Sequence, residues 1–206
     1  MRKGEQTRQE IIHKAAPIFN QRGFDGAALS DLMRATGLGK GGIYRHFDSK
    51  QQLAGEAFDY AWQLALDKRF AGTQQITDTV DRLKQILWNF RDRRAGLVEG
   101  GCPLLNMATD SDDGKPALRT KARRAFGSWL ARLRSIVEEG QTRGEIRSGI
   151  DASELATLMV TSLEGGFMLE RLQKNPAPLN IACRHLEEYL ETGVRAKHKK
   201  AQVEKT

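Results

Sequence analysis

Residues 28–50 read ALSDLMRATGLGKGGIYRHFDSK, and this stretch decides the fold. Apolar residues at helical spacing predict two short helices, over 29–36 and 40–47, with Gly37 in the turn between them. Two short helices joined by a tight turn that contains glycine predict a helix-turn-helix, whose second helix enters the major groove of DNA. The side chains that we expect to point inward and fix the angle between the helices are Leu32, Leu38, Ile43 and Phe47.

The opposite side of the second helix is polar and basic. Lys40 and Tyr44 are four residues apart and therefore share a face, which is flanked by Gly41, Gly42, Arg45 and His46. This face can donate hydrogen bonds to phosphates and base edges, and it carries no acidic residue before Asp48. Each glycine costs a helix about 1 kcal/mol relative to Ala. Close approach of the backbone to a surface such as DNA is a physical reason to accept that cost.

The same stretch allows a second interpretation. Gly37-Leu-Gly39-Lys-Gly41-Gly42 fits G-x-G-x-x-G, the dinucleotide-binding fingerprint. That fingerprint requires a preceding strand in a βαβ unit. The residues before it, SDLMRAT, have helical spacing instead, so we do not expect a nucleotide site or any other cofactor.

Charge is concentrated at the two ends of the chain, which carries a formal net charge of +7. Residues 1–50 hold nine basic and five acidic side chains, whereas residues 51–194 are close to neutral. A positive N-terminal module favours an anionic partner such as nucleic acid, although 50 residues can carry this excess by chance. No signal peptide or membrane span is expected, and Cys102 and Cys183 predict neither a disulfide framework nor a zinc site. A cytoplasmic globular protein without metal is the expectation.

The remaining sequence also has helical periodicity. A first helix from Thr7 should end at Gly23, and Pro17 should kink it or force a local adjustment. Ser49-x-x-Gln52 forms a capping box that opens a long helix. Further helices are expected at 76–94, 101–110, 116–140, 152–173 and 178–197. The fold class is therefore all-α, with an N-terminal three-helix helix-turn-helix domain (1–50), a six-helix domain (51–197) and a basic tail (198–206).

Thr7–Leu53 resembles the TetR family of transcriptional regulators. The residues that carry the resemblance are Ile18-Phe19-x-x-x-Gly23-Phe24, Leu32, Gly37-Leu38, Lys40-Gly41, Ile43-Tyr44-x-His46-Phe47 and Lys50-x-x-Leu53. The resemblance implies that Lys40 and Gly41 lie at the groove, while Tyr44, His46 and Lys50 hold phosphates.

The chain departs from the family at two positions. Ala28 replaces a common Ser or Thr, with Ser30 two residues later, and Gly39 replaces a common Ser. Each change removes a side-chain cap and a phosphate contact. The DNA-binding residues predicted from the face and the resemblance together are Ser30, Lys40, Gly41, Gly42, Tyr44, Arg45, His46 and Lys50.

The domain at 51–197 resembles the family's ligand-binding and dimerisation domain. Its many aromatic and Met residues either fill the core or line a pocket for a mostly apolar small-molecule effector. The candidate pocket residues are Trp62, Trp88, Cys102, Met107, Trp129 and Phe167. Gly101-Cys102-Pro103 also resembles a segment in which a cysteine senses electrophiles or oxidants, and the alternative is a buried, inert thiol.

The last two predicted helices suggest a two-fold interface, with Gly165, Gly166, Leu186, Tyr189 and Leu190 as its residues. We therefore expect a homodimeric regulator, a repressor of a palindromic operator in double-stranded DNA. No catalytic constellation is present, and the four histidines are scattered, so an enzyme is not expected. The alternative is a helical small-molecule-binding protein that has lost DNA binding.

Overall fold

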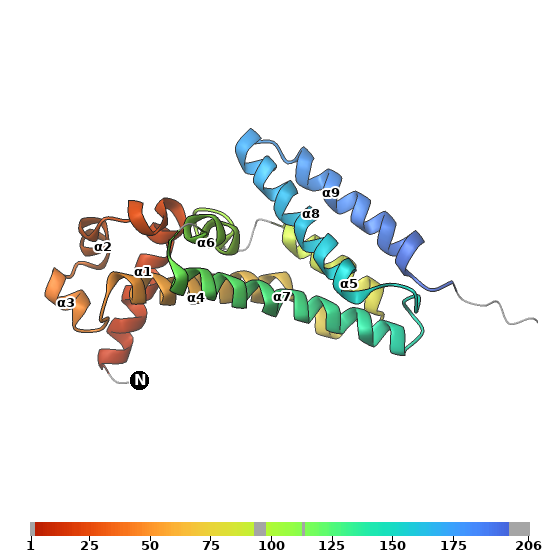
Figure 1. Ribbon diagram of the computed structural model, residues 1–206, viewed down its shortest axis with the longest axis horizontal. Helices are drawn as coiled ribbons and strands as arrows, with labels where there is room; N and C mark the ends of the chain where they lie inside the picture. Colours follow the sequence, from red (N-terminus) through yellow and green to blue (C-terminus); the bar gives the residue numbers. More distant parts are fainter. Residues whose placement is uncertain (1–2, 93–97, 113, 198–206) are drawn as a thin grey trace, which may run out of the picture. The chain divides into compact units, whose positions relative to one another are not determined.

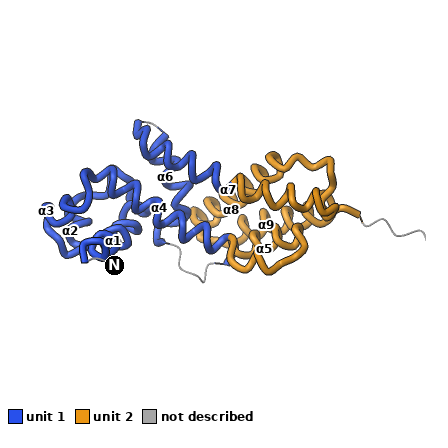
Figure 2. Tube along the Cα trace, turned by 90° about the horizontal axis from the view of Figure 1, so that it is seen from below, with its two compact units in different colours: residues 1–69, 92–129 blue, residues 70–91, 130–206 orange. Residues whose placement is uncertain are grey.

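The computed structural model describes residues 3–92, 98–112 and 114–197. In these residues the chain forms nine α-helices, one 3-10 turn and one π-helical turn, which confirms the predicted all-α fold (Figure 1). The chain divides into two compact units, and each unit takes two separate stretches of the sequence (Figure 2). Unit 1 contains residues 1–69 and 92–129, and unit 2 contains residues 70–91 and 130–206. The functional boundary predicted between residues 50 and 51 stays a prediction.

Unit 1 begins with α1 (Lys3–Gly26), α2 (Leu29–Thr36) and α3 (Lys40–Tyr44), and we call residues 3–47 the head. The backbone of α1 leaves helical angles at Gly23, where φ is 69°, a left-handed value that favours glycine. α1 continues through Pro17 with helical backbone angles, and the kink or local adjustment expected there stays a prediction. The turns on both sides of Pro17 are held in the core by Ala15, Ala16 and Phe19, which compensates for the one missing hydrogen bond.

The head core holds α3 against its neighbours. Leu32, Ile43 and Phe47 are fully buried and Leu38 packs against them, so the inward positions predicted from the sequence are confirmed. Fully burying one such side chain is worth about 1.5–3 kcal/mol. The other core residues come from α1, from the link between α1 and α2, and from α4 (Lys50–Arg69): Ile11, Ile12, Ala15, Ala16, Phe19, Ala27, Leu53, Ala54, Ala57 and Ala61.

Two helix ends in the head refine the sequence expectations. α3 ends at Tyr44 instead of the predicted residue 47, because the His46 N–H bonds to the Ile43 carbonyl at 3.0 Å in the three-residue pattern of a tightened helix end. The capping box of α4 is confirmed, since Ser49 Oγ accepts the Gln52 N–H at 3.0 Å. Gln52 Oε1 in turn accepts the N–H of Asp48 at 2.6 Å.

Unit 1 is completed by α6 (Pro103–Ser111) and the first half of α7 (Pro116–Thr142). Within unit 1, α6 lies beside α1 and α4 (Figure 1). Pro103 stands in the first turn of α6, where its missing N–H removes no helical hydrogen bond. The division between the two units falls inside α7, after Trp129.

Unit 2 contains the 3-10 turn Thr73–Gln75, α5 (Thr79–Arg91), the second half of α7, α8 (Ala152–Gln173), α9 (Ala177–Tyr189) and the π-helical turn Leu190–Val194. The Asp151 carboxylate caps α8 by accepting the N–H groups of Ser153 at 2.8 Å and Glu154 at 2.9 Å. α8 and α9 pack closely at Gly166, where an added Cβ would lie 3.0 Å from the Cα of Leu179.

The last helix is shorter than the predicted 178–197. After Val194 the chain forms an antiparallel bridge between Ile146 and Arg195, because the Arg147 N–H bonds to the Val194 carbonyl at 3.0 Å and the Ala196 N–H to the Glu145 carbonyl at 2.8 Å. These inter-segment hydrogen bonds replace those of a continued helix. The predicted basic tail, 198–206, lies outside the described residues.

Ion pairs tie α5 to the end of α7 in unit 2. Arg82 Nη1 lies 2.7 Å from Glu139 Oε2, and this hydrogen bond lowers the pKa of Glu139. Glu191 behaves in the same way, since hydrogen bonds from Lys84 and then Arg195 lower its pKa.

No helix among the described residues is both long and apolar enough to span a bilayer. In the same parts of the chain, His, Cys, Asp and Glu side chains do not gather in threes or more as a metal site would require.

Candidate DNA-binding face and effector cluster

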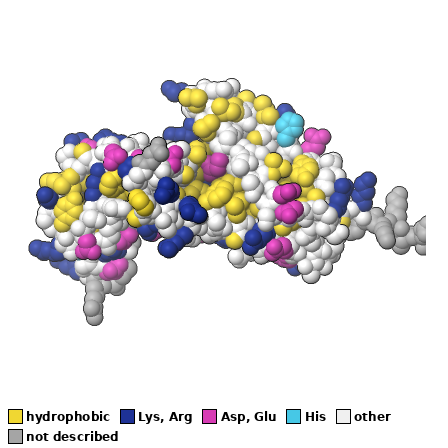
Figure 3. All heavy atoms as spheres, in the orientation of Figure 1, with side chains coloured by type: hydrophobic (Ala, Val, Ile, Leu, Met, Phe, Trp, Pro, Cys, Tyr) yellow, Lys and Arg dark blue, Asp and Glu magenta, His cyan; other side chains and the backbone are white. Residues whose placement is uncertain are grey.

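α3 buries one side and exposes the other. Ile43 and Phe47 are each 1% exposed. Among the predicted DNA-binding residues at positions 40–46, the exposed ones are Lys40, Gly41 and Arg45, and the half-buried ones are Gly42, Tyr44 and His46. Figure 3 shows Lys and Arg side chains around this end of unit 1. The arrangement leaves a basic surface next to a rigid inner face, as a helix that reads a DNA groove requires.

The two glycines of α3 have different surroundings. A Cβ added to Gly42 would lie 3.3 Å from the Leu38 Cβ, so packing inside the head already favours a small residue there. A Cβ added to Gly41 would meet no atom within 4 Å. The chain's own packing therefore does not require glycine at Gly41, and its predicted close approach to DNA stays a prediction.

The start of α2 is also open to an anion. Ala28 and Gly39, the N-caps of α2 and α3, make no side-chain cap hydrogen bond, as their side chains predicted. Ser30 is exposed in the first turn of α2. The carboxylate of Asp31 beside it is paired with Arg22 and lies 3.6 Å from Arg34, which reduces its repulsion of a phosphate.

Lys50 lies at the start of α4, with its Nζ 4.5 Å from the centre of the Phe24 ring. This cation–π contact holds the ammonium group near the end of α1. Lys50 therefore lies close to the head, and the phosphate contact assigned to it stays a prediction.

Arg8 is a residue of the head that the sequence argument missed. Its guanidinium lies 4.8 Å from the centre of the Phe47 ring and bonds to Glu56 of α4 at 2.6 Å. It thereby fixes the segment after α3 to both α1 and α4. The sequence did carry a signal for Arg8, because it lies four residues before the buried Ile12 and therefore on the apolar face of α1.

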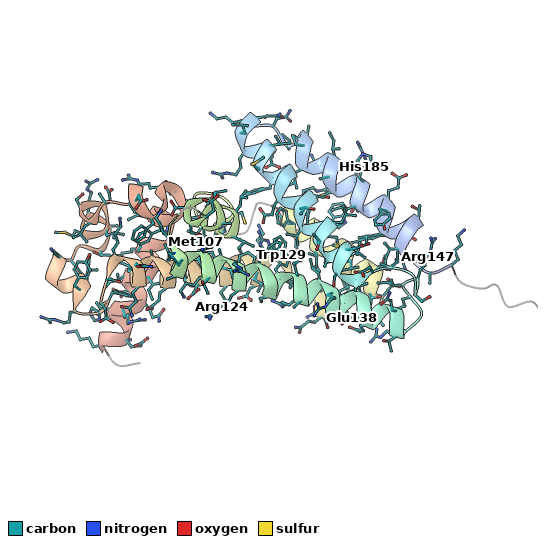
Figure 4. All side chains as sticks on the ribbon, viewed as in Figure 1. Met107, Arg124, Trp129, Glu138, Arg147 and His185 are labelled. Carbon is teal, nitrogen blue, oxygen red and sulfur yellow. The ribbon has the colours of Figure 1, made fainter. Side chains whose placement is uncertain are left out.

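Three of the six predicted effector residues come together in unit 1. The rings of Trp62 and Trp129 lie 5.7 Å apart at an angle of 60°, and both are buried. The guanidinium of Arg69 lies 4.9 Å from the centre of the Trp62 ring and 4.1 Å from that of Trp129, which is labelled in Figure 4. Its Nη2 donates to Cys102 Sγ at 3.2 Å. We call Trp62, Arg69, Cys102 and Trp129 the indole cluster.

Arg69 was missed from the sequence, although the signal was present. It lies seven residues, or two helical turns, after Trp62 and continues the buried face of α4 that includes Leu66. A basic residue in this register is unusual, because a charge is buried only when its surroundings compensate for it.

The other three predicted effector residues lie elsewhere. Met107, labelled on α6 in Figure 4, lines a small cavity between α1, α4 and α6 in unit 1. Trp88 and Phe167 belong to unit 2, where Trp88 is 49% exposed under Arg91 and Phe167 stands edge-on to Phe90 at 5.9 Å.

The second cysteine has a different environment. Burial raises the pKa of Cys183 to about 11, and its Sγ lies 4.0 Å from the Leu87 carbonyl. It is therefore an unreactive core thiol at neutral pH.

The predicted dimer residues divide by burial. Gly166, Leu186 and Leu190 are buried inside the single chain, so they contribute to the packing of the protomer itself. Tyr189 is 41% exposed, and a Cβ on Gly165 would meet open space. Exposed apolar residues that the sequence argument did not choose lie on the same two helices: Leu158, Met168, Leu169, Leu172 and Ile181.

Two helices joined at a glycine turn, apolar inside and basic outside, define a helix-turn-helix DNA-binding protein. Residues 11–57 match the family model described as bacterial regulatory proteins of the tetR family, and residues 79–186 match that of the tetracyclin repressor-like C-terminal domain. The chain belongs to the TetR family of transcriptional regulators, which are not enzymes.

Individual relatives agree with this assignment. The crystal structure of a TetR transcriptional regulator from Chloroflexus aurantiacus is 45% identical, with a TM-score of 0.90, over 96% of this chain and 100% of that chain. The HTH-type transcriptional repressor DhaR from Mycobacterium sp. is 26% identical over 84% of this chain and 86% of its own. A regulator from Saccharomonospora viridis, solved in complex with choline, shares the fold at 23% identity and a TM-score of 0.79, over 94% of this chain and 100% of that one.

Proposed function

We propose that this chain is a cytoplasmic homodimeric repressor that binds a palindromic operator and is released from it by a small-molecule effector. The observation that carries the proposal is the division of α3, with Ile43 and Phe47 in the head core and Lys40, Gly41 and Arg45 exposed opposite them. The printed name of the relative DhaR, a transcriptional repressor, supports the sign of regulation.

The DNA-binding part of the proposal assigns roles within the head. Lys40 and Gly41 lie at the groove, Tyr44, His46 and Lys50 hold phosphates, and Ser30, Gly42 and Arg45 border the contact. Wild-type protein should select a preferred site from random duplex DNA. Tyr44→Ala should then weaken binding of that site without changing the thermal unfolding temperature, since Tyr44 is outside the head core.

Salt dependence separates phosphate contacts from general charge. Lys40→Ala should reduce the slope of log K against log salt by about one unit if Lys40 neutralises one phosphate. Arg134→Ala, which removes one positive charge from unit 2, is the matched control and should leave the slope unchanged. Absence of any preferred site after selection would refute the DNA-binding role and leave a helical small-molecule-binding protein as the function.

The dimer is supported by a stripe of apolar side chains on α8. Leu158, Gly165 and Leu172 are seven residues apart, with Met168 in the same stripe, which is the spacing of a helix–helix seam. Leu158 is 44% exposed, Met168 49% and Leu172 77% in the single chain. Hydrophobic side chains gather over the α8–α9 end of unit 2 in Figure 3, and His185, labelled in Figure 4, lies on α9. A second copy of the chain would cover this stripe by two-fold symmetry.

Sedimentation at micromolar concentration tests the dimer. Leu172→Glu places a charge in the stripe and should produce monomers with unchanged helix content, whereas Leu64→Glu is a control at an exposed apolar residue of α4. A wild-type chain that sediments as a monomer would contradict the proposal.

The effector is proposed to act at the indole cluster. Trp62 and Trp129 supply two aromatic faces, which suit a mostly apolar ligand, and Arg69 between them suits one that carries a π-system or a negative charge. Choline in the S. viridis regulator shows that a protein with this fold was solved with a small molecule bound. A ligand releases DNA only if it prefers the state that does not bind the operator.

Fluorescence can test the effector site directly. Trp88→Phe removes the exposed indole, so the remaining Trp emission comes from the buried pair Trp62 and Trp129. Compounds found in a thermal-shift screen should change this emission and lower operator affinity. Covalent modification of Cys102 is the competing mechanism, and Cys102→Ser separates the two, since a response driven by non-covalent binding survives that substitution and one driven by the thiol does not.

A further inference from the structure

Asn20 of α1 fastens the stretch of chain that precedes α6. Its Nδ2 lies within hydrogen-bond distance of three carbonyl oxygens, those of Val98 at 3.3 Å, Glu99 at 2.9 Å and Gly101 at 3.1 Å. The side-chain amide of Asn20 thus serves three of the backbone carbonyl groups of this turn, which is not part of a helix. Residues 98–101 are therefore fastened to α1 chiefly by the Asn20 side chain, with a further hydrogen bond from Gln21 to the Glu99 carboxylate at 3.0 Å.

Asn106 of α6 closes the arrangement from the other side. Its Nδ2 lies 2.9 Å from the Asn20 carbonyl, 3.0 Å from Asn20 Oδ1 and 3.0 Å from the Gly100 carbonyl. Gly100 has a φ of +115°, and a Cβ there would lie 2.7 Å from the Asn20 carbonyl group, so the backbones approach as closely as glycine permits. We call Asn20, Asn106 and residues 98–101 the asparagine latch.

The latch is attached to the head core. Asn20 follows Phe19, a core residue, and precedes the break of α1 at Gly23. Val98 itself packs against the head core. At the other end of α6, Asp110 Oδ2 accepts the N–H of Phe24 at 2.8 Å. α6 is thus fastened to α1 at two points, one on each side of Gly23 in the sequence of α1.

The same stretch also borders the indole cluster. Cys102 directly follows residues 98–101, caps α6 and accepts a hydrogen bond from Arg69. Between α1, α4 and α6 lies a cavity of about 20 Å³, lined mainly by apolar side chains. It has room for about one water molecule. The polar contacts of the latch therefore add to the apolar packing that the buried Leu104 and Met107 give α6.

We infer that Asn20 and Asn106 are positioning residues that couple the start of α6 to the DNA-reading head. The inference rests on the proposed function, because it names the contacts through which the effector site and the operator site influence each other. While the hydrogen bonds of the latch are formed, a displacement of residues 98–102 must also displace α1. By linkage, operator binding must also alter the latch.

Hydrogen exchange with and without the selected operator duplex tests the coupling. In wild-type protein, saturating operator should slow amide exchange of residues 98–106 by about threefold or more, although they are outside the DNA-binding face. Asn106→Asp keeps the size of the side chain and removes the donor of three hydrogen bonds. In this variant the operator effect on 98–106 should disappear at saturating DNA, and exchange of the same amides without DNA should rise by about tenfold.

The added charge is controlled by Ala108→Asp, which places a carboxylate at an exposed position of α6 outside the latch hydrogen bonds. Asn106→Ala removes the donor without adding charge and replaces Asn106→Asp if the latter does not fold. The operator effect on 98–106 should persist in Ala108→Asp and vanish in both Asn106 variants.

The possible failures are distinct. A wild-type chain that selects no operator refutes the proposed function. Wild-type protein that binds its operator with no change of exchange at 98–106, or Asn106 variants that retain the full change, overturns the latch while DNA binding stands.

Discussion

Gly165→Ala and Gly166→Ala should change the stability of unit 2 by different amounts, although the two glycines are neighbours in α8. Replacing glycine by Ala inside a helix gains about 1 kcal/mol, and both variants share this gain. At Gly165 the new methyl group meets no atom within 4 Å. At Gly166 it would lie 3.0 Å from the Cα of Leu179 and 3.2 Å from the Cβ of Ala182, so α9 must move.

The difference between the variants therefore equals the overpacking cost, which is about 1–3 kcal/mol. For a chain of this size each kcal/mol shifts the thermal midpoint by about 2–4 °C. We expect Gly165→Ala to unfold above Gly166→Ala in thermal and urea unfolding followed by circular dichroism. Each variant is measured over a hundredfold range of protein concentration, because dimer formation makes stability depend on concentration. Equal midpoints at the lowest concentration, or a more stable Gly166→Ala, would refute the packing argument.

Three further predictions concern single side chains. Ser49→Ala removes the α4 cap and should cost about 1 kcal/mol in urea unfolding, whereas an unchanged midpoint would mean that Gln52 alone caps the helix. In a Cys102→Ser background, Cys183 should react with a thiol reagent at pH 8 about a hundredfold more slowly in the folded than in the unfolded chain, because burial raises its pKa to about 11. Labelling of the folded chain at the rate of a free thiol would contradict that pKa. The hydrogen bond from Arg82 lowers the pKa of Glu139 in the folded chain. The stabilisation by this pair is therefore complete above the unfolded pKa of about 4.3 and is lost as the pH falls through the folded pKa. Arg82→Met should flatten the acid side of a curve of stability against pH, whereas parallel curves for the two proteins would show that the pair contributes nothing.

The helix-turn-helix could be predicted from the sequence because its signals are local. Gly37 ends α2 in the left-handed conformation, and the spacing of Ile43 and Phe47 assigns the inner side of α3. Tertiary contacts explain what local patterns missed. The bridge between Ile146 and Arg195, for example, ended the last helix early.

The effector and dimer residues were harder to predict, because several aromatic and apolar residues at helical spacing can face either the core or a partner. From the sequence, Leu186 and Leu190 could face either a partner chain or the core of their own chain. Only the packing of α9 and the turn after it shows that both are buried in the core. The reverse holds for Leu172, which is 77% exposed. Arg69 was overlooked because a charged residue in an apolar register reads as solvent-exposed until its aromatic neighbours are known.

The division of the chain into interleaved units has a consequence for how such regulators can be recombined. The polypeptide crosses from one unit to the other three times, after residues 69, 91 and 129. The head is therefore not a cassette that a single crossover in the gene could exchange, because its core includes α4 and Val98 as well as α1–α3. A hybrid that takes a new head must also inherit the matching 98–106 stretch. Under the proposed role of α3, point substitution on its outer side is thus a simpler route to a new operator specificity than exchange of whole segments.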